Sequence, residues 1–403
     1  MNVVVTLEHR FSRTPDGALW TDGPHPYQFW TRYLMVFDGV KIVARVRDAE
    51  AAPAAWRRAD GAGVHLCPIP DYLGQRQFLR KFVRVYRSVR GAVEDDDAII
   101  LRVSSAIAGC LEPMLARSRR PYGLEVVNDP RDVFSTGAVQ LAFRPFLRWW
   151  FSGQLRRQCR RAAASSYVTE HVLQERYPCP AFSSGVSDVE LPEDAILSSA
   201  RDCAIARDGR FRLVTVGSLA QMYKAPDQLV RAVADCVAAG LDLELQIIGD
   251  GRHRQELESL TAALGMSGRV RFMGHLPAGA AVRAELDRAD LFVLASRVEG
   301  LPRAMIEAMA RALPCIGSTV GGIPELLAPE DLVPPGDAGR LAGKIREVLC
   351  SPARMSIMSA RNLERAREYR DEVLTGRRTG FYRHVRRQTA AWLRQRHVQA
   401  MAC

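Results

Sequence analysis

The chain has 403 residues, enough for two domains that each bury a core, since a domain typically has about 150 residues. Hydrophobic residues make up 47% of the chain and charged residues 25%, which excludes a disordered or fibrous protein. The 56 Lys and Arg against 45 Asp and Glu give a net charge of +11. This charge predicts attraction to anions in general, whether phosphate compounds, nucleic acid or acidic lipid.

The nine cysteines include no CxxC pair and no His at zinc-ligand spacing. Their odd number argues against a disulfide framework and favours a reducing, cytoplasmic compartment. We expect no export signal, because no basic segment followed by an apolar one opens the sequence, and no membrane span, because no run of 18 apolar residues occurs. The Ala-rich and Arg-rich composition is typical of a GC-rich bacterial genome.

Short apolar runs alternate with helical patterns in the first half of the chain, which indicates a parallel α/β domain. The expected strands are Val3–Thr6, Val40–Val46, Ala98–Arg102 and Leu124–Val127, and the expected helices are Gln75–Arg90 and Val139–Ala162. Pro-rich and polar residues between 178 and 210 break the alternation. We therefore predict one domain over residues 1–200 and a second over residues 201–370.

The second half repeats one pattern, in which an apolar run ends in Gly or Ser and a helical segment follows. The expected strands are Leu213–Val216, Leu243–Ile248, Val270–Met273, Leu291–Leu294 and Pro314–Ile316. This pattern predicts a doubly wound sheet, whose ligands bind beyond the carboxyl ends of the strands. The residues directly after each run are therefore the candidates for a site, and the basic residues 371–403 are expected to form a C-terminal helical segment.

Two carboxylates eight positions apart follow the strand Leu291–Leu294. The candidate ligand-binding residues of this stretch are Glu299, Gly300, Leu301, Pro302 and Glu307. Glu299 lies in a loop and Glu307 in the first turns of the next helix, whose N-terminal amides favour anions. Each acid, taken alone, could equally be a solvated surface charge. The apolar neighbours of Glu307 argue against this interpretation, because an unpaired charge is unfavourable in such surroundings. As a pair, the two carboxylates suit a ligand with two polyol parts, such as a sugar and a ribose.

The E-x7-E pattern and the later run Gly321-Gly322-Ile323-Pro324-Glu325 resemble the retaining nucleotide-sugar glycosyltransferases of family 4. The resemblance is dense from Phe211 to Leu349. It implies the α/β fold called GT-B, with two facing Rossmann-like domains and a C-terminal helix, 371–403, that crosses back to the first domain. It also implies a hexosyltransferase in which Glu299 holds the donor sugar and Glu307 the ribose.

A second part of the resemblance is the turn Gly217-Ser218-Leu219 followed by Tyr223-Lys224-Ala225. The family usually has Arg at the position of Ser218 and Gly at that of Ala225. Lys224 is one of only four lysines in the chain, which hints that a compact ammonium is needed for a diphosphate. An ordinary solvated lysine is the alternative. Gly217, Ser218 and Lys224 are predicted to bind the donor.

Gly249 and Asp250 follow the strand Leu243–Ile248, where the family places backbone around the base. They are donor-binding candidates, although a simple tight turn explains them equally well. In the first domain, Asp16 and Gly17 stand where the family has a Gly-rich loop that contacts the donor phosphates.

The first domain is expected to bind the acceptor. Arg102 and Glu125 are acceptor candidates because they lie at the ends of expected strands. His9 and Asp129 are candidates for orienting the acceptor, so the predicted catalytic set is Glu299, Lys224, His9 and Asp129. Each of the last two is equally well explained by a structural role.

The segment 144–161 combines Phe146, Trp149 and Trp150 with several arginines. It predicts either a helix that lies on an acidic membrane or a helix whose aromatic residues pack in the core. No RNP, zinc-finger or helix-turn-helix signature accompanies it, so we expect no nucleic-acid partner.

The leading hypothesis is a retaining glycosyltransferase that moves a sugar from a UDP- or GDP-linked donor to a sugar, lipid-linked or natural-product acceptor. Polysaccharide, glycolipid or natural-product biosynthesis would use such a reaction. We expect no cofactor and no metal, because no Asp-x-Asp follows a strand. The alternatives are a nucleotide-sugar epimerase or phosphorylase of the same fold, and a non-catalytic binding protein at an acidic membrane. The expected location is the cytoplasm, with peripheral contact at the inner membrane face as a variant.

Overall fold

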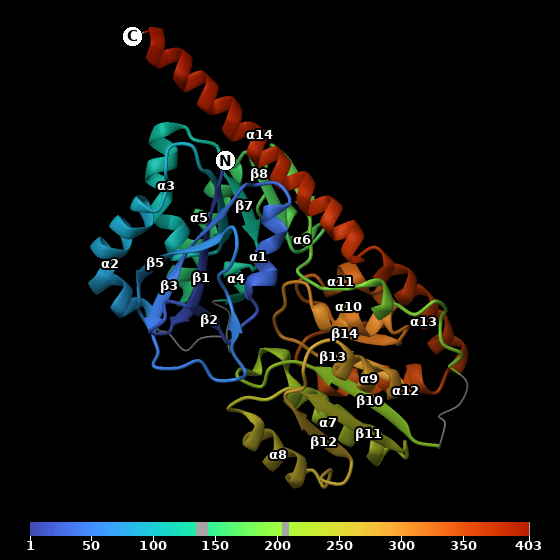
Figure 1. Ribbon diagram of the computed structural model, residues 1–403. Helices are drawn as coiled ribbons and strands as arrows, with labels where there is room; N and C mark the ends of the chain where they lie inside the picture. The colour runs from blue at the N-terminus through green and yellow to red at the C-terminus, as the bar shows by residue number, and fades with distance from the viewer. Residues whose placement is uncertain (134–143, 204–208, 403) are drawn as a thin grey trace. The chain divides into compact units, whose positions relative to one another are not determined.

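The computed structural model describes residues 1–133, 144–203 and 209–402 (Figure 1). The chain divides into two compact units. The N-terminal unit comprises Met1–Pro130, Trp150–Val186 and Thr375–Cys403, and the C-terminal unit comprises Arg131–Trp149 and Ser187–Leu374. Within the described residues, no helix is both long enough and apolar enough to cross a membrane.

The N-terminal unit is built on a mostly parallel sheet. Its strands are β1 (Val3–Arg13), β2 (Leu19–Thr21), β3 (Val40–Asp48), β4 (Arg57–Arg58), β5 (Val64–Pro70), β6 (Ala98–Val103), β7 (Gly123–Val126), β8 (Ala164–Tyr167) and β9 (Phe182–Gly185). Strand β1 lies in the middle and pairs in parallel with both β3 and β6. Beyond a register shift between Thr6 and Arg10, β1 runs on into an antiparallel hairpin with β2.

Helices cover both faces of this sheet. The helices of this part of the fold are α1 (Tyr27–Leu34), α2 (Gly74–Gly91), α3 (Ala106–Ser118), α4 (Pro130–Val133), α5 (Arg144–Arg161), α6 (Val172–Arg176) and α14 (Asp371–Ala402). The unit boundaries cut three of them, because α4 after Pro130, α5 before Trp150 and α14 before Thr375 are assigned to the C-terminal unit. Successive residues of β1 point to opposite faces, so Val4 packs with α2 and α3 while Val3 and Val5 pack with α1 and α14. Both faces are buried, which explains the continuous apolar runs of the parallel strands.

The C-terminal unit has a six-stranded parallel sheet in the order β12-β11-β10-β13-β14-β15. The strands are β10 (Phe211–Val216), β11 (Leu243–Ile248), β12 (Val270–Gly274), β13 (Leu291–Leu294), β14 (Cys315–Ser318) and β15 (Leu332–Val333). The helices are α7 (Pro226–Ala238), α8 (Arg254–Ala263), α9 (Ala280–Arg288), α10 (Arg303–Ala310), α11 (Ile323–Leu326), α12 (Ala338–Leu349) and α13 (Pro352–Arg367). The strand order reverses between β10 and β13, and a crevice at such a switch point is where doubly wound sheets bind ligands.

Each strand predicted in the second half is present, with β14 displaced to Cys315–Ser318 from the expected Pro314–Ile316. Strands β2, β4, β5, β8 and β9 of the N-terminal unit and β15 of the C-terminal unit were not predicted. The first five residues of the expected helix Val139–Ala162 lie outside the described residues. The sequence placed the domain boundary after residue 200, whereas the C-terminal unit begins at Ser187, because Val189, Leu191 and Ala195 pack into its core.

Candidate functional site

Two side chains predicted from separate motifs meet at the carboxyl ends of β10 and β13. Lys224 Nζ donates a hydrogen bond of 2.9 Å to Glu299 Oε1, across 75 residues of sequence. The hydroxyl of Ser296 donates to the same oxygen at 2.8 Å and so orients the carboxylate. The side chains of Lys224 and Glu299 are only 17% and 8% exposed. The structure therefore places a cation and a carboxylate side by side at the switch point of the sheet.

A second ion pair ties the same two loops together. The guanidinium of Arg297 donates to Asp227 at 2.7 Å and to the carbonyl of Met222 at 2.8 Å. Its backbone N–H donates to the carbonyl of Tyr223 at 2.7 Å. Burial is the largest influence on the pKa of Asp227 and raises it, but the hydrogen bonds from Arg297 and Gln228 and the charge of Arg297 together hold this pKa below its usual value. The loop that bears Lys224 is thus fixed to the loop that bears Glu299.

Arg297 and Asp227 were not predicted as site residues. Arg297 lies two residues before Glu299 and Asp227 three residues after Lys224, and their opposite charges were a signal that could have paired them. Their contact is a tertiary one between loops 70 residues apart, so no local spacing rule reveals it.

The glycines of the donor motifs let the loops pack on one another. A Cβ at Gly217 would lie 2.2 Å from Cδ of Lys224, so the lysine stem passes directly over this glycine. Gly249 has φ +139°, and a Cβ there would lie 2.0 Å from the carbonyl oxygen of Gly217. Backbone hydrogen bonds from Gly217 to Ile248 and from Leu219 to Asp250, both 2.9 Å, join the two turns. Gly249 and Asp250 therefore support the position of Lys224.

The two departures from the family pattern have different structural outcomes. Ser218 is exposed, and its hydroxyl accepts a hydrogen bond from the N–H of Ala220 at 3.2 Å. Ala225 adopts the left-handed conformation, with φ +50° and ψ +47°, just where the family has Gly. The backbone geometry of the motif is thus kept although the residue has a Cβ, which makes this conformation unfavourable.

The run Gly321-Gly322 shapes the loop of Glu299. Gly321 has φ +53°, and a Cβ there would lie 1.9 Å from the carbonyl oxygen of Glu299. The N–H of Gly322 donates to the carbonyl of Gly300 at 2.6 Å. Leu301 and Pro302 are buried, and α10 begins at Arg303. The Gly-Gly motif therefore holds the Glu299 loop through its backbone.

Glu307 is half-buried on α10 among apolar neighbours. Burial raises the pKa of its carboxyl group, while the positive charges of Arg303 and Arg283 act in the opposite direction. The sequence prediction that Glu307 is an acid in an unusually apolar setting agrees with this placement.

The acceptor candidates Arg102 and Glu125 lie inside the N-terminal unit. They form an ion pair of 2.5 Å in which both side chains are buried. Glu125 also accepts hydrogen bonds from the hydroxyls of Tyr33, at 2.9 Å, and Tyr382, at 3.1 Å. Burial first, and then the charge of Glu125, raise the pKa of Tyr33 to about 12. These contacts join β6 and β7 to α1 and α14.

The two candidates for orienting the acceptor are also engaged within the N-terminal unit. Asp129 is buried and accepts hydrogen bonds from Tyr177 at 2.5 Å and from Arg176 at 2.7 Å. His9 shares a hydrogen bond of 2.7 Å between Nε2 and the hydroxyl of Thr21, and burial lowers the pKa of its ring.

Glu8, the neighbour of His9, was not predicted as a site residue. Its carboxylate accepts from the N–H groups of Ala106 at 2.9 Å and Ile107 at 3.1 Å, and from the hydroxyl of Tyr72 at 3.0 Å. It therefore occupies the N-terminus of α3, where the free amides favour an anion.

Asp16 and Gly17 form the turn of the hairpin between β1 and β2. Gly17 has φ +83°, and Asp16 accepts hydrogen bonds from the hydroxyl of Thr14 at 2.5 Å and the N–H of Ala18 at 3.2 Å. The resemblance implied a loop that contacts the donor phosphates at this position. The structure shows a turn between two strands, because β1 continues to Arg13.

The aromatic residues at the start of α5 are exposed. Phe146, Trp149 and Trp150 have exposed fractions of 55%, 69% and 50%. Of the two interpretations of this segment, packing of these aromatics in a core is therefore wrong.

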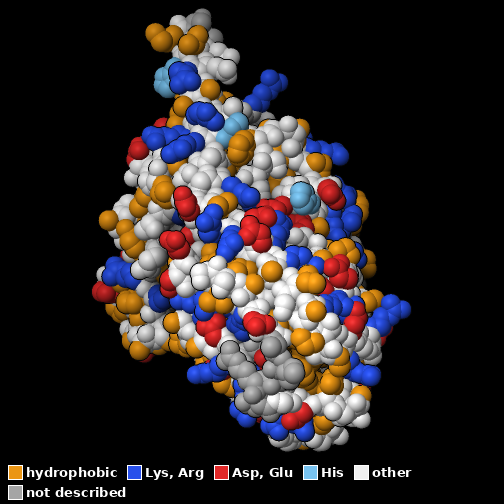
Figure 2. Space-filling model, turned by 90° about the vertical axis from the view of Figure 1, so that its right-hand side faces the viewer, with side chains coloured by type: hydrophobic (Ala, Val, Ile, Leu, Met, Phe, Trp, Pro, Cys, Tyr) orange, Lys and Arg blue, Asp and Glu red, His pale blue; other side chains and the backbone are white. Residues whose placement is uncertain are grey.

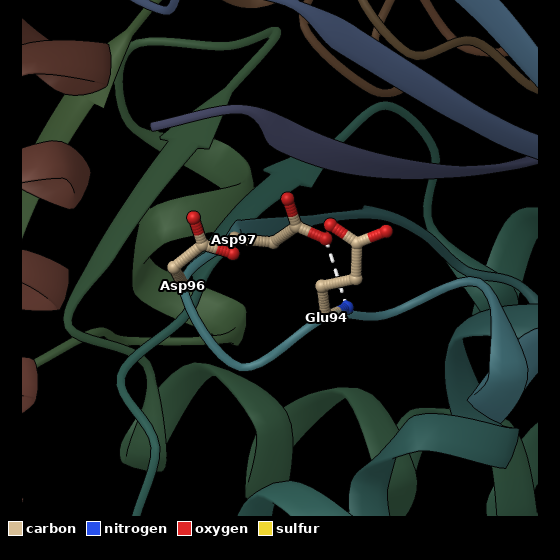
Figure 3. A group of neighbouring side chains, drawn as sticks. All are labelled: Glu94, Asp96 and Asp97. Carbon is tan, nitrogen blue, oxygen red and sulfur yellow. Dashed lines mark hydrogen bonds between the residues drawn. The ribbon is translucent and has the colours of Figure 1, made fainter.

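An acidic cluster lies in the loop before β6. The carboxylates of Glu94, Asp96 and Asp97 lie within 4.8 Å of one another (Figure 3). Lys41 Nζ contacts Glu94 at 2.8 Å and Asp97 at 2.9 Å. Because this ammonium already neutralises part of the cluster, we assign no metal to it.

Known proteins resemble this chain in sequence and in fold. Residues 210–351 match the family described as Glycosyl transferases group 1. Protein CapJ of Staphylococcus aureus is 23% identical over 339 residues, which are 81% of each chain. The GDP-mannose-dependent monoacylated alpha-(1-6)-phosphatidylinositol monomannoside mannosyltransferase of Corynebacterium glutamicum is 34% identical over 146 residues, 34% of this chain and 38% of that protein. The structure of Anabaena Alr3699/HepE in complex with UDP and glucose aligns with a TM-score of 0.63 at 15% identity, covering 93% of this chain and 97% of that one.

Two Rossmann-like units, together with the structural likeness over 93% of the chain, show the GT-B fold of glycosyltransferases. This chain is a glycosyltransferase, and its residues 210–351 form a domain of the Glycosyl transferases group 1 family. The predicted fold, with its C-terminal helix, and the predicted enzyme class are confirmed. The family match favours sugar transfer over the epimerase, phosphorylase and non-catalytic alternatives.

Proposed function

We propose that the enzyme transfers a hexose from a nucleoside diphosphate sugar, linked to UDP or GDP, to an acceptor hydroxyl with retention at the anomeric carbon. The contact between Lys224 and Glu299 carries the proposal. An ammonium suits a diphosphate and a carboxylate suits sugar hydroxyls, so one ligand would engage both. Two similar proteins support the donor class, since one binds UDP and glucose and the other is named as GDP-mannose-dependent.

The donor would exchange the partners of this ion pair. Its sugar hydroxyls would donate to Glu299, and its phosphate oxygens would accept from Lys224, which is released from Glu299 at that moment. Ser296 keeps Glu299 oriented in both states through its hydroxyl. Each charge is thereby held in place in the free enzyme, so little reorganisation is needed when charge develops on the leaving diphosphate.

The bond between the anomeric carbon and the diphosphate oxygen would break as the bond to the acceptor oxygen forms. The acceptor proton would pass to an oxygen of the departing diphosphate on the same face of the sugar. Lys224 would stabilise the negative charge on this leaving group, which is larger in the transition state than in the bound donor. Glu307 would accept hydrogen bonds from the ribose hydroxyls.

For the acceptor we propose a sugar chain carried on a lipid, with the enzyme bound peripherally at the inner face of the membrane. The mannosyltransferase of C. glutamicum, which is named for a phosphatidylinositol monomannoside, supports this class. The exposed aromatic residues of α5 are compatible with it.

Nucleotide binding and product analysis test the proposal. Calorimetry with UDP and GDP should give binding to one of them, and NMR of the product should show the donor's anomeric configuration. We expect Glu299→Gln to keep nucleotide binding and to lose transfer, because the carboxylate contacts the sugar and not the nucleotide. Glu347→Gln is the matched control, since Glu347 is exposed on α12, where it pairs with Lys344 at 2.7 Å and with Arg354 of α13. Undiminished transfer by Glu299→Gln, or an inverted product, would contradict the assignment.

A further inference from the structure

Helix α2 carries an unusual set of side chains for an outer helix. Its 18 residues include six cations and no acid. The cations are Arg76, Arg80, Lys81, Arg84, Arg87 and Arg90. Val85 and Val89 are buried against β5 and α3, so the opposite side of the helix faces outward (Figure 1). The helix therefore carries a charge of +6 over its 18 residues.

Four of these arginines form a stripe. Arg76, Arg80, Arg84 and Arg87 follow one another at spacings of four, four and three residues, which places them on one face of the helix. Within the described part of the chain, none of the four forms an ion pair with an acid. Like charges at such spacings repel one another, so an external anion would relieve an unfavourable arrangement.

Exposed apolar side chains lie beside the stripe. Leu79, Phe82 and Val83 have exposed fractions of 71%, 42% and 58%. Their spacing of three and four residues also places them on one face, next to that of the arginines. A helix with an apolar stripe and flanking cations is the type that lies in the interface of an anionic membrane.

Other surfaces of the chain differ from this one. Figure 2 shows Lys and Arg side chains interspersed with Asp and Glu on its face of the molecule. On α13, Ile357 is 65% exposed, but Arg354 and Arg361 of the same helix pair with Asp331. On α5, Arg157 lies 3.7 Å from Glu112, and Arg156 donates to the carbonyl of Arg176.

We propose that α2 docks the enzyme on anionic phospholipid, with Leu79, Phe82 and Val83 inserted among the acyl chains and the arginine stripe on the headgroups. The apolar stripe decides between a bilayer and a soluble polyanion, because a polyanion offers nothing to bury these three side chains. Membrane docking would serve the reaction only if the acceptor is lipid-linked, so this inference rests on the proposed function. Vesicle binding, however, is measured without donor or acceptor. Failure of vesicle binding and failure of sugar transfer are therefore distinguishable.

The test is flotation of the full chain with vesicles of phosphatidylglycerol and phosphatidylcholine, beside vesicles of phosphatidylcholine alone. We expect binding to the anionic vesicles only, weakened by added salt. Arg80→Gln/Arg84→Gln should lower the apparent affinity about 30-fold, since each cation near the surface contributes about one factor of five. Leu79→Ser/Phe82→Ser should also lower it, while Ile357→Ser on α13 should leave it unchanged.

Four outcomes would overturn the proposal. One is the absence of binding to anionic vesicles by the unmodified chain. Another is binding by Leu79→Ser/Phe82→Ser equal to that of the unmodified chain together with displacement by nucleic acid, which would identify a polyanion site. A third is loss of binding in Trp149→Ser/Trp150→Ser with full binding in both α2 variants, which would place the contact on α5. The last is equal loss of binding in the Ile357→Ser control. Thermal unfolding of each variant, compared with the unmodified chain, shows that the proteins tested are folded.

Discussion

Charged side chains at strand ends have different roles in the two units. In the C-terminal unit, Lys224 and Glu299 meet in loops whose glycines allow close backbone packing. In the N-terminal unit, Arg102 and Glu125 meet inside the unit, where tyrosine hydroxyls complete their hydrogen bonds. A position at the end of a strand therefore does not by itself make a charge part of a site. The partners decide, because two loop charges can exchange a partner for a ligand, whereas a buried network supports the fold.

The first test of this difference removes the buried carboxylate. Glu125→Leu should lower the free energy of unfolding of the N-terminal unit by about 3–5 kcal/mol, because the buried charge of Arg102 loses its partner. Urea denaturation followed by circular dichroism measures the change. Glu347→Leu on the surface of α12 is the control, with an expected loss of at most about 1 kcal/mol. Equal losses in the two variants would show that the Arg102 pair is not structural.

The second test removes the cation of the site. Lys224→Met should lower kcat/KM for sugar transfer by about 100- to 1000-fold, the usual effect of losing one group that stabilises transition-state charge. Steady-state kinetics with the preferred donor provides the measurement. Lys344→Met removes a similarly half-buried lysine from an ion pair on α12 of the same unit, away from the sheet's switch point, and should retain full activity. If both variants kept full activity, Lys224 would have no part in the reaction.

Crowding the lysine stem is a milder change. Gly217→Ala would place a methyl group 2.2 Å from Cδ of Lys224, so the ammonium must shift. Displacement of a catalytic group by about 1 Å can cost up to about 100-fold in rate, and we expect a loss of 10- to 100-fold in kcat/KM. Gly343→Ala on α12, where a Cβ meets nothing within 4 Å, should leave the rate unchanged. A normal rate in Gly217→Ala would show that the position of the lysine is not critical.

Alkaline pH should act on the buried network. The pKa of Tyr33 is raised from its ordinary value of 10.0 to about 12, so the folded state holds this proton more tightly than the unfolded state does. The contribution of this proton to the free energy of unfolding is complete below pH 10 and is lost as the pH rises through about 12. This contribution is at most about 2.7 kcal/mol. Tyr33→Phe should therefore flatten the fall in unfolding free energy between pH 10 and 12. An unchanged slope in this variant would contradict the assignment.

The smallest effect on stability is expected at Ala225, where the family has Gly. Ala225→Gly would relieve a left-handed conformation worth about 1–2 kcal/mol but would remove a buried methyl group worth about 0.8 kcal/mol. The melting temperature should rise slightly, and nucleotide affinity should stay the same. A large loss of stability would mean that the methyl group of Ala225 is essential to the packing of the core of the C-terminal unit.

The sequence predicts the C-terminal unit well because parallel strands buried on both faces are continuous apolar runs, as in Leu243–Ile248. It predicts Lys224 and Glu299 because each lies in a motif directly after such a run. It does not predict β8, because Ala164–Tyr167 includes two serines and forms no continuous apolar run, although all four residues are buried. Nor does it predict the contact of Glu125 with Tyr382, 257 residues away, since no local pattern encodes so distant a pairing.

That distant contact has a consequence for synthesis of the protein. The N-terminal unit needs Phe381, Tyr382 and Val385 of α14 to cover one face of its sheet, and these residues follow the C-terminal unit in the chain. On the ribosome, Trp30 and Tyr33 therefore keep an uncovered apolar surface until the C-terminal unit has been translated. A chain truncated before α14 would expose this surface permanently and would be a target for chaperones and proteases, so α14 couples the folding of the N-terminal unit to synthesis of the C-terminal one.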